Sequence, residues 1–485
     1  MKNKIIVLTI SLQIFTGSFL LSISNIRLAN AQTSRTSVKS IPLPTGSGAR
    51  ALGQGGAFIA VADDATAASW NPAGLIQLEK PEVSIVGAFL TTAQDFHSDL
   101  AGTRFQKEVL NPNLGDEDVS RWDLNFISGA YPFRFLNRNF VAALNYHQIF
   151  DFHMDLSFTP SVSIIPQIKK FEKEQFDFKS SGGIGGLSPA IAVLILPKLS
   201  FGLTVNIFDD EFFNSYGWKE TITGTGKGRQ PGIYGPTFFR QKTSAKDYHG
   251  VNVSMGIKWD IWEKDEKSFT FGAVFHSPYT ARFDEEVNVV SSSVFQSSRI
   301  VINDDKSRVK MDWPMSIGMG LGFRYTDALS FSFDVSWTDW SEWVQERSVN
   351  GSPWENTRPI GFIDKESSEH DDIEDTYAVR FGTEYLFIRE KEIIALRGGL
   401  FYEPRPSLGT PKDFDRNSIR TDYNGNPTSV WGFSLGAGLT TDRFSIDTAY
   451  QFRYIRDMEA NDIGLRGASV DSVENLFLAS LIIYF

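Results

Sequence analysis

The segment MDWPMSIGMGLGFRY, residues 311 to 325, alternates between large apolar residues and small or polar ones. Every odd position is apolar, from Met311 to Tyr325, whereas Gly and Ser fill much of the other set. Successive side chains of a strand point to opposite faces, so residues two apart share a face. The segment therefore predicts a long strand with one apolar face and one face of small or polar residues.

The same alternation recurs along the chain and predicts fourteen strands. They are expected near 81–92, 121–134, 139–158, 184–196, 199–210, 247–263, 266–283, 311–326, 328–343, 373–388, 391–403, 428–441, 443–454 and 475–485. Long loops, among them 211–246 and 284–310, alternate with short turns such as Pro197-Lys198 and Asp442. An even number of strands with long loops on one side and tight turns on the other is typical of outer-membrane β-barrels. The predicted fold is an all-β, 14-stranded antiparallel transmembrane β-barrel, with a soluble sandwich as the alternative.

The composition of the 485 residues excludes several classes of protein. There is no Cys, so disulfides and thiolate metal sites are excluded. An excess of 58 acidic over 47 basic residues argues against a nucleic-acid binder. After the N-terminus, the longest apolar run is 190–196, which is too short for a membrane-spanning helix.

The first 31 residues have the pattern of a secretory signal peptide. Lys2 and Lys4 precede an apolar stretch, and Ala29-Asn30-Ala31 supplies the small residues expected before a cleavage site. We therefore expect residues 1–31 to be removed and the chain to be exported to the bacterial cell outer membrane.

Residues 32–80 lack the alternation and form a separate unit in this interpretation. The stretch 46–58 is rich in Gly and Ala, which permits close packing of the backbone. Asn71 followed by Pro72 is the pattern of a helix cap with proline at the first helical position. We expect a compact hatch, or plug, at 32–80 inside the barrel of residues 81–485.

Several motifs resemble the FadL/TodX family of outer-membrane transporters. They are GQGGA at 53–57, WNPAGL at 70–75, FGAVFHSPY at 271–279, WTDWS at 337–341 and LRGGLFY at 396–402. The resemblance implies fourteen strands, an N-terminal hatch and passive uptake of long-chain fatty acids or other hydrophobic small molecules. It further implies a gate at Asn71, Pro72 and Ala73, facing the strand near 139–158, and a lateral exit beside that strand. No Gly or Pro in 139–147 announces a kink there.

Two groups of residues are candidates for ligand contact. The predicted loop 211–246 is rich in aromatic residues, among them Phe212, Phe213, Trp218, Phe238 and Phe239. Such a loop either captures a hydrophobic ligand or packs on itself over the barrel mouth. The second group is four inward-facing cations, Lys258, Arg324, Arg380 and Arg397. These cations either bind a carboxylate headgroup or pair with inward Asp334, Glu384 and Asp447.

The remaining predictions concern partners and alternatives. We expect a monomer in contact with outer-membrane lipid, without cofactor, metal, nucleic-acid partner or enzymatic activity. His147 and His153 share a strand face but have no obvious third ligand. The alternative function is a barrel that serves protein secretion, because secretion shuttles carry a similar hatch segment.

Overall fold

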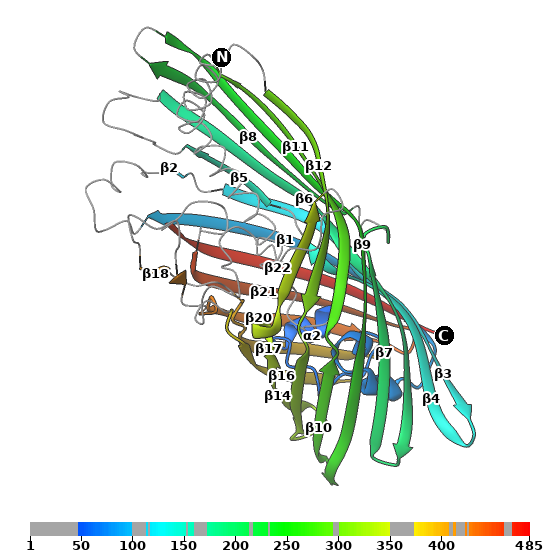
Figure 1. The fold of residues 1–485 in the computed structure, drawn as a ribbon. Helices are drawn as coiled ribbons and strands as arrows, with labels where there is room; N and C mark the ends of the chain where they lie inside the picture. The colour runs from blue at the N-terminus through cyan, green and yellow to red at the C-terminus, as the bar shows by residue number, and fades with distance from the viewer. Residues whose placement is uncertain are drawn as a thin grey trace.

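The computed structural model describes residues 47–98, 113–114, 117–151, 154–159, 172–212, 217–230, 233–293, 300–349, 373–406, 411–413, 422–423, 426–459 and 468–485. Within them the chain forms a closed antiparallel β-barrel of fourteen strands (Figure 1). The signal peptide expected at 1–31 lies outside the described residues. The predicted fold class is confirmed.

Nine positions of the barrel are single strands and five are built from two pieces each. The single strands are β1 (Glu82–Ser98), β3 (Glu117–Phe135), β6 (Glu172–Leu196), β9 (Ile233–Lys264), β16 (Thr376–Ile388), β17 (Ile393–Tyr402), β20 (Val430–Thr440), β21 (Phe444–Glu459) and β22 (Ala468–Tyr484). The paired pieces are β4 (Arg138–Asp151) and β5 (Met154–Thr159), β7 (Leu199–Asp209) and β8 (Gly217–Gln230), β10 (Lys267–His276) and β11 (Tyr279–Ser293), β12 (Ile300–Trp313) and β13 (Ser316–Arg324), and β14 (Leu329–Thr338) and β15 (Val344–Val349). Three short strands lie outside this set, β2 (Asn113–Leu114), β18 (Pro411–Asp413) and β19 (Asp422–Tyr423).

The first and last strands close the barrel. β1 pairs with β22 along its whole length, from Glu82 opposite Tyr484 to Ser98 opposite Ala468. Closure satisfies the backbone groups of both edges, which a structure that crosses lipid requires.

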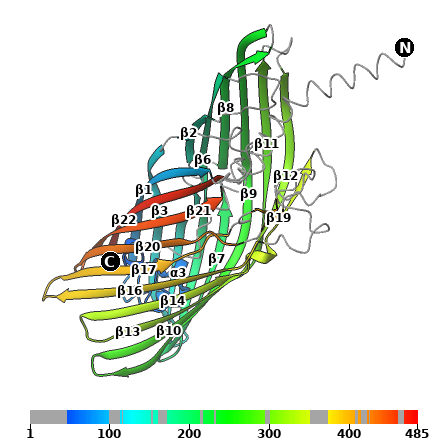
Figure 2. The same cartoon turned by 90° about the vertical axis from the view of Figure 1, so that its left-hand side faces the viewer.

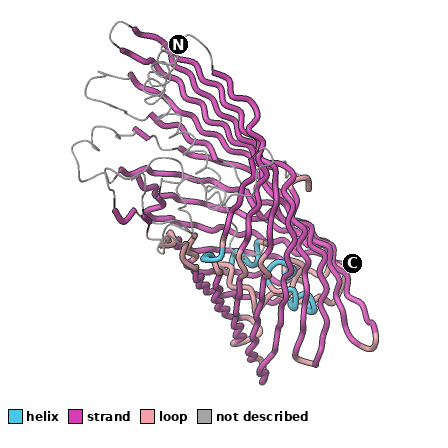
Figure 3. The backbone as a smooth tube through the Cα atoms, in the orientation of Figure 1, coloured by secondary structure: helices cyan, strands magenta, loops and turns pink. Residues whose placement is uncertain are grey.

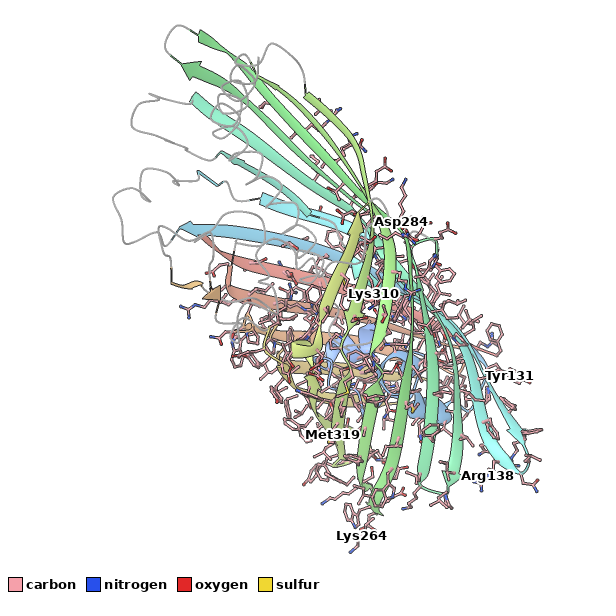
Figure 4. The ribbon with its side chains drawn as sticks, viewed as in Figure 1. Tyr131, Arg138, Lys264, Asp284, Lys310 and Met319 are labelled. Atoms are coloured by element: carbon pink, nitrogen blue, oxygen red, sulfur yellow. The ribbon has the colours of Figure 1, made fainter. Side chains whose placement is uncertain are left out.

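The outer face of the barrel is apolar in the part next to the short turns. On β13, Met319 and Leu321 are exposed while Gly320 and Gly322 are buried on the inner side. Figure 4 shows Met319 on the outer surface, with Arg138 and Lys264 at the end that carries the short turns. Exposed apolar side chains around a barrel form the band that contacts lipid.

Two strands that the sequence predicts as continuous are interrupted. The expected strand 266–283 breaks at Ser277 and Pro278, and the expected strand 311–326 breaks at Pro314 and Met315. The prediction of unbroken strands was wrong because proline has no backbone N–H to donate to the ladder. The breaks lie opposite one another, since β10 pairs with β13 below them and β11 pairs with β12 above them.

A third interruption lies at the same level. The 3-10 helix η2 (Trp340–Glu342) separates β14 from β15. Above these breaks the sheet of β8, β9, β11 and β12 extends well beyond the rest of the wall, as Figures 1 and 2 show.

The prediction that 211–246 and 284–310 are loops was also wrong. β8 and β9 form a hairpin that pairs from Trp218 opposite Ala245 to Gln230 opposite Ile233, and β11 and β12 extend in the same way. Strands outside the membrane have no lipid-facing side, so they need no apolar face. Their sequences therefore lack the alternation on which the strand predictions depended.

The N-terminal segment, residues 47–81, lies inside the barrel near the short turns (Figure 3). It contains α2 (Ala49–Gly53), α3 (Ala67–Trp70) and the 3-10 helix η1 (Pro72–Gln77). The backbone N–H of Ala73 donates to the side chain of Asn71, as a cap with Pro72 at the first helical position requires. No helix among the described residues is long and apolar enough to cross a membrane.

Candidate functional site

Two glycines of the barrel wall allow the N-terminal segment to approach closely. A Cβ atom on Gly202 of β7 would lie 2.1 Å from the carbonyl carbon of Pro72, and one on Gly256 of β9 would lie 2.0 Å from Asn71 Oδ1. No side chain fits at either position while the segment is in place. The inward glycines of the alternating pattern therefore serve as contact sites for the segment.

Asn71 is fully buried and joins the segment to the wall. Its Nδ2 donates to the carbonyl oxygen of Ile59 at 2.8 Å and to that of Ile257 in β9 at 2.9 Å. The hydroxyl of Ser200 in β7 donates to the carbonyl oxygen of Ala73 at 3.1 Å. The amide of Asn71 therefore holds together two parts of the segment and one strand of the barrel.

The strands that Asn71, Pro72 and Ala73 contact differ from the one that the resemblance implies. The resemblance placed Asn71, Pro72 and Ala73 against the strand near 139–158, whereas their contacts are with β7 and β9. β4 is instead contacted by the apolar C-terminal end of η1, where Leu75 and the C-cap residue Leu78 share a buried cluster with Val141 and Ala143 of β4. The glycines decide this arrangement, because only β7 and β9 offer Gly where Asn71 and Pro72 must fit.

A buried ion network also joins the segment to the wall. Arg397 Nε contacts Glu384 at 2.6 Å, and Arg397 Nη1 contacts Asp447 at 2.6 Å. Arg50 of the segment contacts the same Glu384 at 3.2 Å and its own neighbour Asp63 at 2.6 Å. Glu384 is therefore shared by one cation of the wall and one of the segment.

Two further inward residues bind the backbone of the segment. The carboxylate of Asp334 accepts hydrogen bonds from the N–H groups of Phe58 and Ile59, at 2.7 and 2.9 Å. Lys258 Nζ donates to the carbonyl oxygen of Ala62 at 3.3 Å. These charge-assisted contacts fix the backbone of the segment at positions where its side chains are apolar and make no hydrogen bond.

The segment also contains a buried acid. Burial raises the pKa of Asp64 to about 6, and the neighbouring Asp63 adds to this, while hydrogen bonds from Thr66 oppose it. The backbone N–H and the hydroxyl of Thr66 both donate to Asp64 Oδ1. These contacts shape the turn that leads into α3.

The four predicted cations are not brought together. Lys258, Arg380 and Arg397 are buried and have protein partners, whereas Arg324 ends β13 at the short turns and is exposed. Arg397 pairs with Glu384 and Asp447. Pairing with inward acids was the alternative to binding a carboxylate headgroup in the sequence analysis. Arg380 pairs instead with Glu403 at 2.6 Å, a partner that sequence reasoning missed. A role of these cations in ligand binding stays a prediction.

An aromatic cluster, missed by sequence reasoning, lies at the level of the strand breaks. Its buried members are Ile184, Phe208, Ala245, Tyr248, Ala281, Phe283, Val309, Met311, Trp313, Trp340, Trp343 and Ile373. Tyr279 packs against it, with its ring centroid 4.8 Å from that of Phe208 and 6.0 Å from that of Trp313.

The strand breaks turn these side chains inward. The alternation placed Met311 and Trp313 on the same face as Met319 and Leu321, but the first two are buried and the last two are exposed. The interruption at Pro314 and Met315 exchanges the two faces of the strand, because the period of two is kept only within an unbroken ladder. In the sequence, Pro278 and Pro314 were the only features that indicated this exchange of faces.

The predicted aromatic residues of 211–246 are only partly described. Phe212 is half-buried after the end of β7, and Phe213 lies outside the described residues. Trp218 belongs to β8, and Phe238 and Phe239 belong to β9, where they pair with Thr225 and Gly224. Their role in capture stays a prediction.

Within the described residues, the ladder between β3 and the third position of the barrel, β4 and β5, is incomplete. β3 pairs with β4 from Phe135 opposite Arg138 to Phe126 opposite His147. Beyond that rung, within the part of the chain that the structure describes, β3 pairs with β1, and β5 pairs with β6 and β2. The register of β4 on β6 also shifts between Gln148 and Phe150.

A closed barrel with an apolar outer face, a folded segment in its lumen and aromatic residues beyond that segment defines an outer-membrane channel. A family model described as outer membrane protein transport protein (OMPP1/FadL/TodX) matches residues 28–464. The chain belongs to this family, whose members are outer-membrane channels for the uptake of hydrophobic compounds.

Solved structures show the same fold at low sequence identity. A FadL homologue of Pseudomonas aeruginosa is 14% identical, with 92% of this chain and 99% of that chain covered and a TM-score of 0.59. The toluene transporter TodX of Pseudomonas putida is 12% identical, with 92% and 100% covered and a TM-score of 0.55. The toluene transporter TbuX of Ralstonia pickettii is 13% identical, with 91% and 99% covered and a TM-score of 0.52. No curated protein matches the chain in sequence.

Proposed function

We propose that this channel takes up long-chain fatty acids or other hydrophobic small molecules passively, and that the N-terminal segment is its gate. The observation that supports this is the polar attachment of the segment, through Asn71, Asp334 and Arg50, below the buried aromatic cluster. Exposing each CH₂ group of a ligand to water costs about 0.8 kcal/mol, so an apolar passenger needs apolar contacts along its route.

The route begins at the extended sheet. We propose that the aromatic residues of β8, β9 and their surroundings, namely Phe212, Phe213, Trp218, Phe238 and Phe239, capture the ligand from the outer surface. The aromatic cluster around Trp313 and Tyr279 then receives it. Both steps keep apolar surface away from water.

The exit leads sideways in this proposal. We propose that the ligand leaves beyond the last described rung between β3 and β4, at Phe126 and His147, where β3 and β5 are not paired within the described residues. A lateral exit delivers an apolar ligand into lipid, whereas an axial exit requires that it pass the N-terminal segment and enter water. The free energy of transfer therefore favours the lateral route.

Replacing Asn71 with alanine tests the gate. The change removes two hydrogen bonds to carbonyl oxygens and the cap on Ala73, with an expected local cost of about 0.5–2 kcal/mol. We expect uptake of a labelled long-chain fatty acid to change while the barrel stays folded, because the strand ladder does not depend on this amide. Uptake is measured in cells at matched surface levels, with the mobility of unheated protein on gels as the folding control.

Asn139→Ala is the matched control, because Asn139 is exposed beside a short turn and its Oδ1 accepts a hydrogen bond from the exposed side chain of Arg134. Uptake that is equal in wild-type, Asn71→Ala and Asn139→Ala cells would make Asn71, Pro72 and Ala73 packing residues and remove them from the gate.

A further inference from the structure

A continuous row of uncharged polar side chains crosses five positions of the inner wall, and we call it the polar belt. It consists of Asn145, Ser188, Asn206, Asn252, Ser254 and His276. Asn145 Nδ2 donates to the carbonyl oxygen of Ser188 at 2.8 Å, and the hydroxyl of Ser188 donates to Asn206 Oδ1 at 2.7 Å.

The belt continues from β7 to β10. Asn206 Nδ2 donates to Asn252 Oδ1 at 2.7 Å and to Ser254 Oγ at 3.0 Å. Ser254 Oγ lies 2.7 Å from His276 Nδ1. Strands distant in the sequence thus contribute to one hydrogen-bonded layer.

This layer lies between the N-terminal segment and the aromatic cluster. On the inner face of β7, the hydroxyl of Thr204 donates to the carbonyl oxygen of Ala68 in the segment, Asn206 belongs to the belt, and Phe208 belongs to the cluster. On β9, Gly256 lies against Asn71 of the segment, and Ser254, two residues away on the same inner face, belongs to the belt. A ligand that moves from the cluster toward the segment meets the belt first.

Three buried polar atoms at the belt have no hydrogen-bond partner within the described residues. They are Asn145 Oδ1, His147 Nδ1 and His276 Nε2. His147 shares the inner face of β4 with Asn145. Buried polar groups are nearly always paired, so unpaired ones mark a place where water or a ligand supplies the missing bond.

The hydrogen bonds already made in the belt indicate whether an unpaired atom is a donor or an acceptor. Ser254 Oγ already accepts from Asn206, so its own hydrogen is free to go to His276 Nδ1. A neutral imidazole then carries its proton on Nε2, which becomes a free donor. Asn145 Oδ1 is a free acceptor, because the amide nitrogen of Asn145 is already bound to Ser188.

We infer that the polar belt binds the uncharged hydrogen-bonding group of an otherwise apolar ligand, such as a hydroxyl group on an aromatic or alkyl body. A hydroxyl can accept from a free donor such as His276 Nε2 at one end of the belt or donate to a free acceptor such as Asn145 Oδ1 at the other, whereas a carboxylate only accepts. The belt itself carries no cation, and Lys258, Arg380 and Arg397 are bound to the segment or to acids. This inference rests on the proposed function and names neutral amphiphiles as one class among its substrates.

The test uses probes that differ only in the polar group, namely tritiated 4-octylphenol, octylbenzene and 4-octylbenzoate. Binding to purified protein held in amphipol is measured by scintillation proximity, and uptake is measured in cells. We expect the variant at the end of the belt that binds the hydroxyl, His276→Phe or Asn145→Leu, to weaken binding of 4-octylphenol about 3- to 10-fold, the range for one hydrogen bond, and both variants to leave binding of octylbenzene unchanged. His276→Gln keeps a donor and should restore much of the affinity.

His249→Phe is the matched control, because His249 is exposed on the outer side of β9 and pairs with Asp209 at 2.9 Å. Binding of 4-octylphenol that is the same in wild type, His276→Phe and Asn145→Leu would overturn the inference, as would tighter binding of 4-octylbenzoate than of 4-octylphenol by the wild type. If wild-type cells took up none of the three probes faster than cells without the protein, the proposed function itself would fail.

Discussion

Replacing Arg397 with methionine is expected to destabilise the barrel by about 3–5 kcal/mol, the usual cost of breaking a buried ion pair from one side. Arg397 is 7% exposed and lies between Glu384 and Asp447, each at 2.6 Å. Without it, two buried carboxylates face each other, and only Arg50 of the N-terminal segment remains near Glu384. The measurement is urea unfolding of the protein in lipid vesicles, followed by tryptophan fluorescence.

Arg389→Met is the control for this change. Arg389 is exposed and pairs with Glu392 at 2.7 Å in a short turn, a geometry that contributes little to stability. Equal unfolding midpoints for Arg397→Met and Arg389→Met would contradict the buried network as a source of stability.

Adding methyl groups at the contact glycines is expected to expel the N-terminal segment from its place. In Gly202→Ala combined with Gly256→Ala, the new Cβ atoms would lie 2.1 Å from Pro72 and 2.0 Å from Asn71, so the segment must move away. A fourteen-stranded barrel is wide enough to hold a water-filled lumen once its plug is displaced. We expect conductance in planar lipid bilayers to rise from nearly closed to porin-like.

Gly87→Ala combined with Gly129→Ala is the matched control, because a Cβ atom at either position meets nothing within 4 Å. Both double variants should migrate as folded barrels on unheated gels, since neither change touches the strand ladder. Low conductance in the folded Gly202→Ala and Gly256→Ala protein would show that the segment does not block the lumen through these contacts.

Some features of the site could be predicted from local patterns in the sequence, and others could not. The cap at Asn71 and Pro72 was correctly placed, because a cap depends on neighbours in the chain. The inward direction of Lys258, Arg380 and Arg397 followed from the period of two within unbroken strands. Glu403 as the partner of Arg380 did not follow, because it lies beyond the end of β17, where the alternation carries no information.

The sequence by itself determined the number of strands, the closed barrel and the presence of small residues on the inner wall. These features follow from the requirement that each strand present an apolar side to lipid, because this requirement makes apolar residues alternate with small or polar ones along the sequence. Only the tertiary structure decided which face Trp313 takes, which strands receive Asn71 and which carboxylate meets each cation. The breaks at Pro278 and Pro314 exchange the inner and outer faces of two strands. The N-terminal segment packs against β7 and β9 because Gly202 and Gly256 leave room for Pro72 and Asn71 there. Contacts of this kind join residues far apart in the chain, and no local pattern records them.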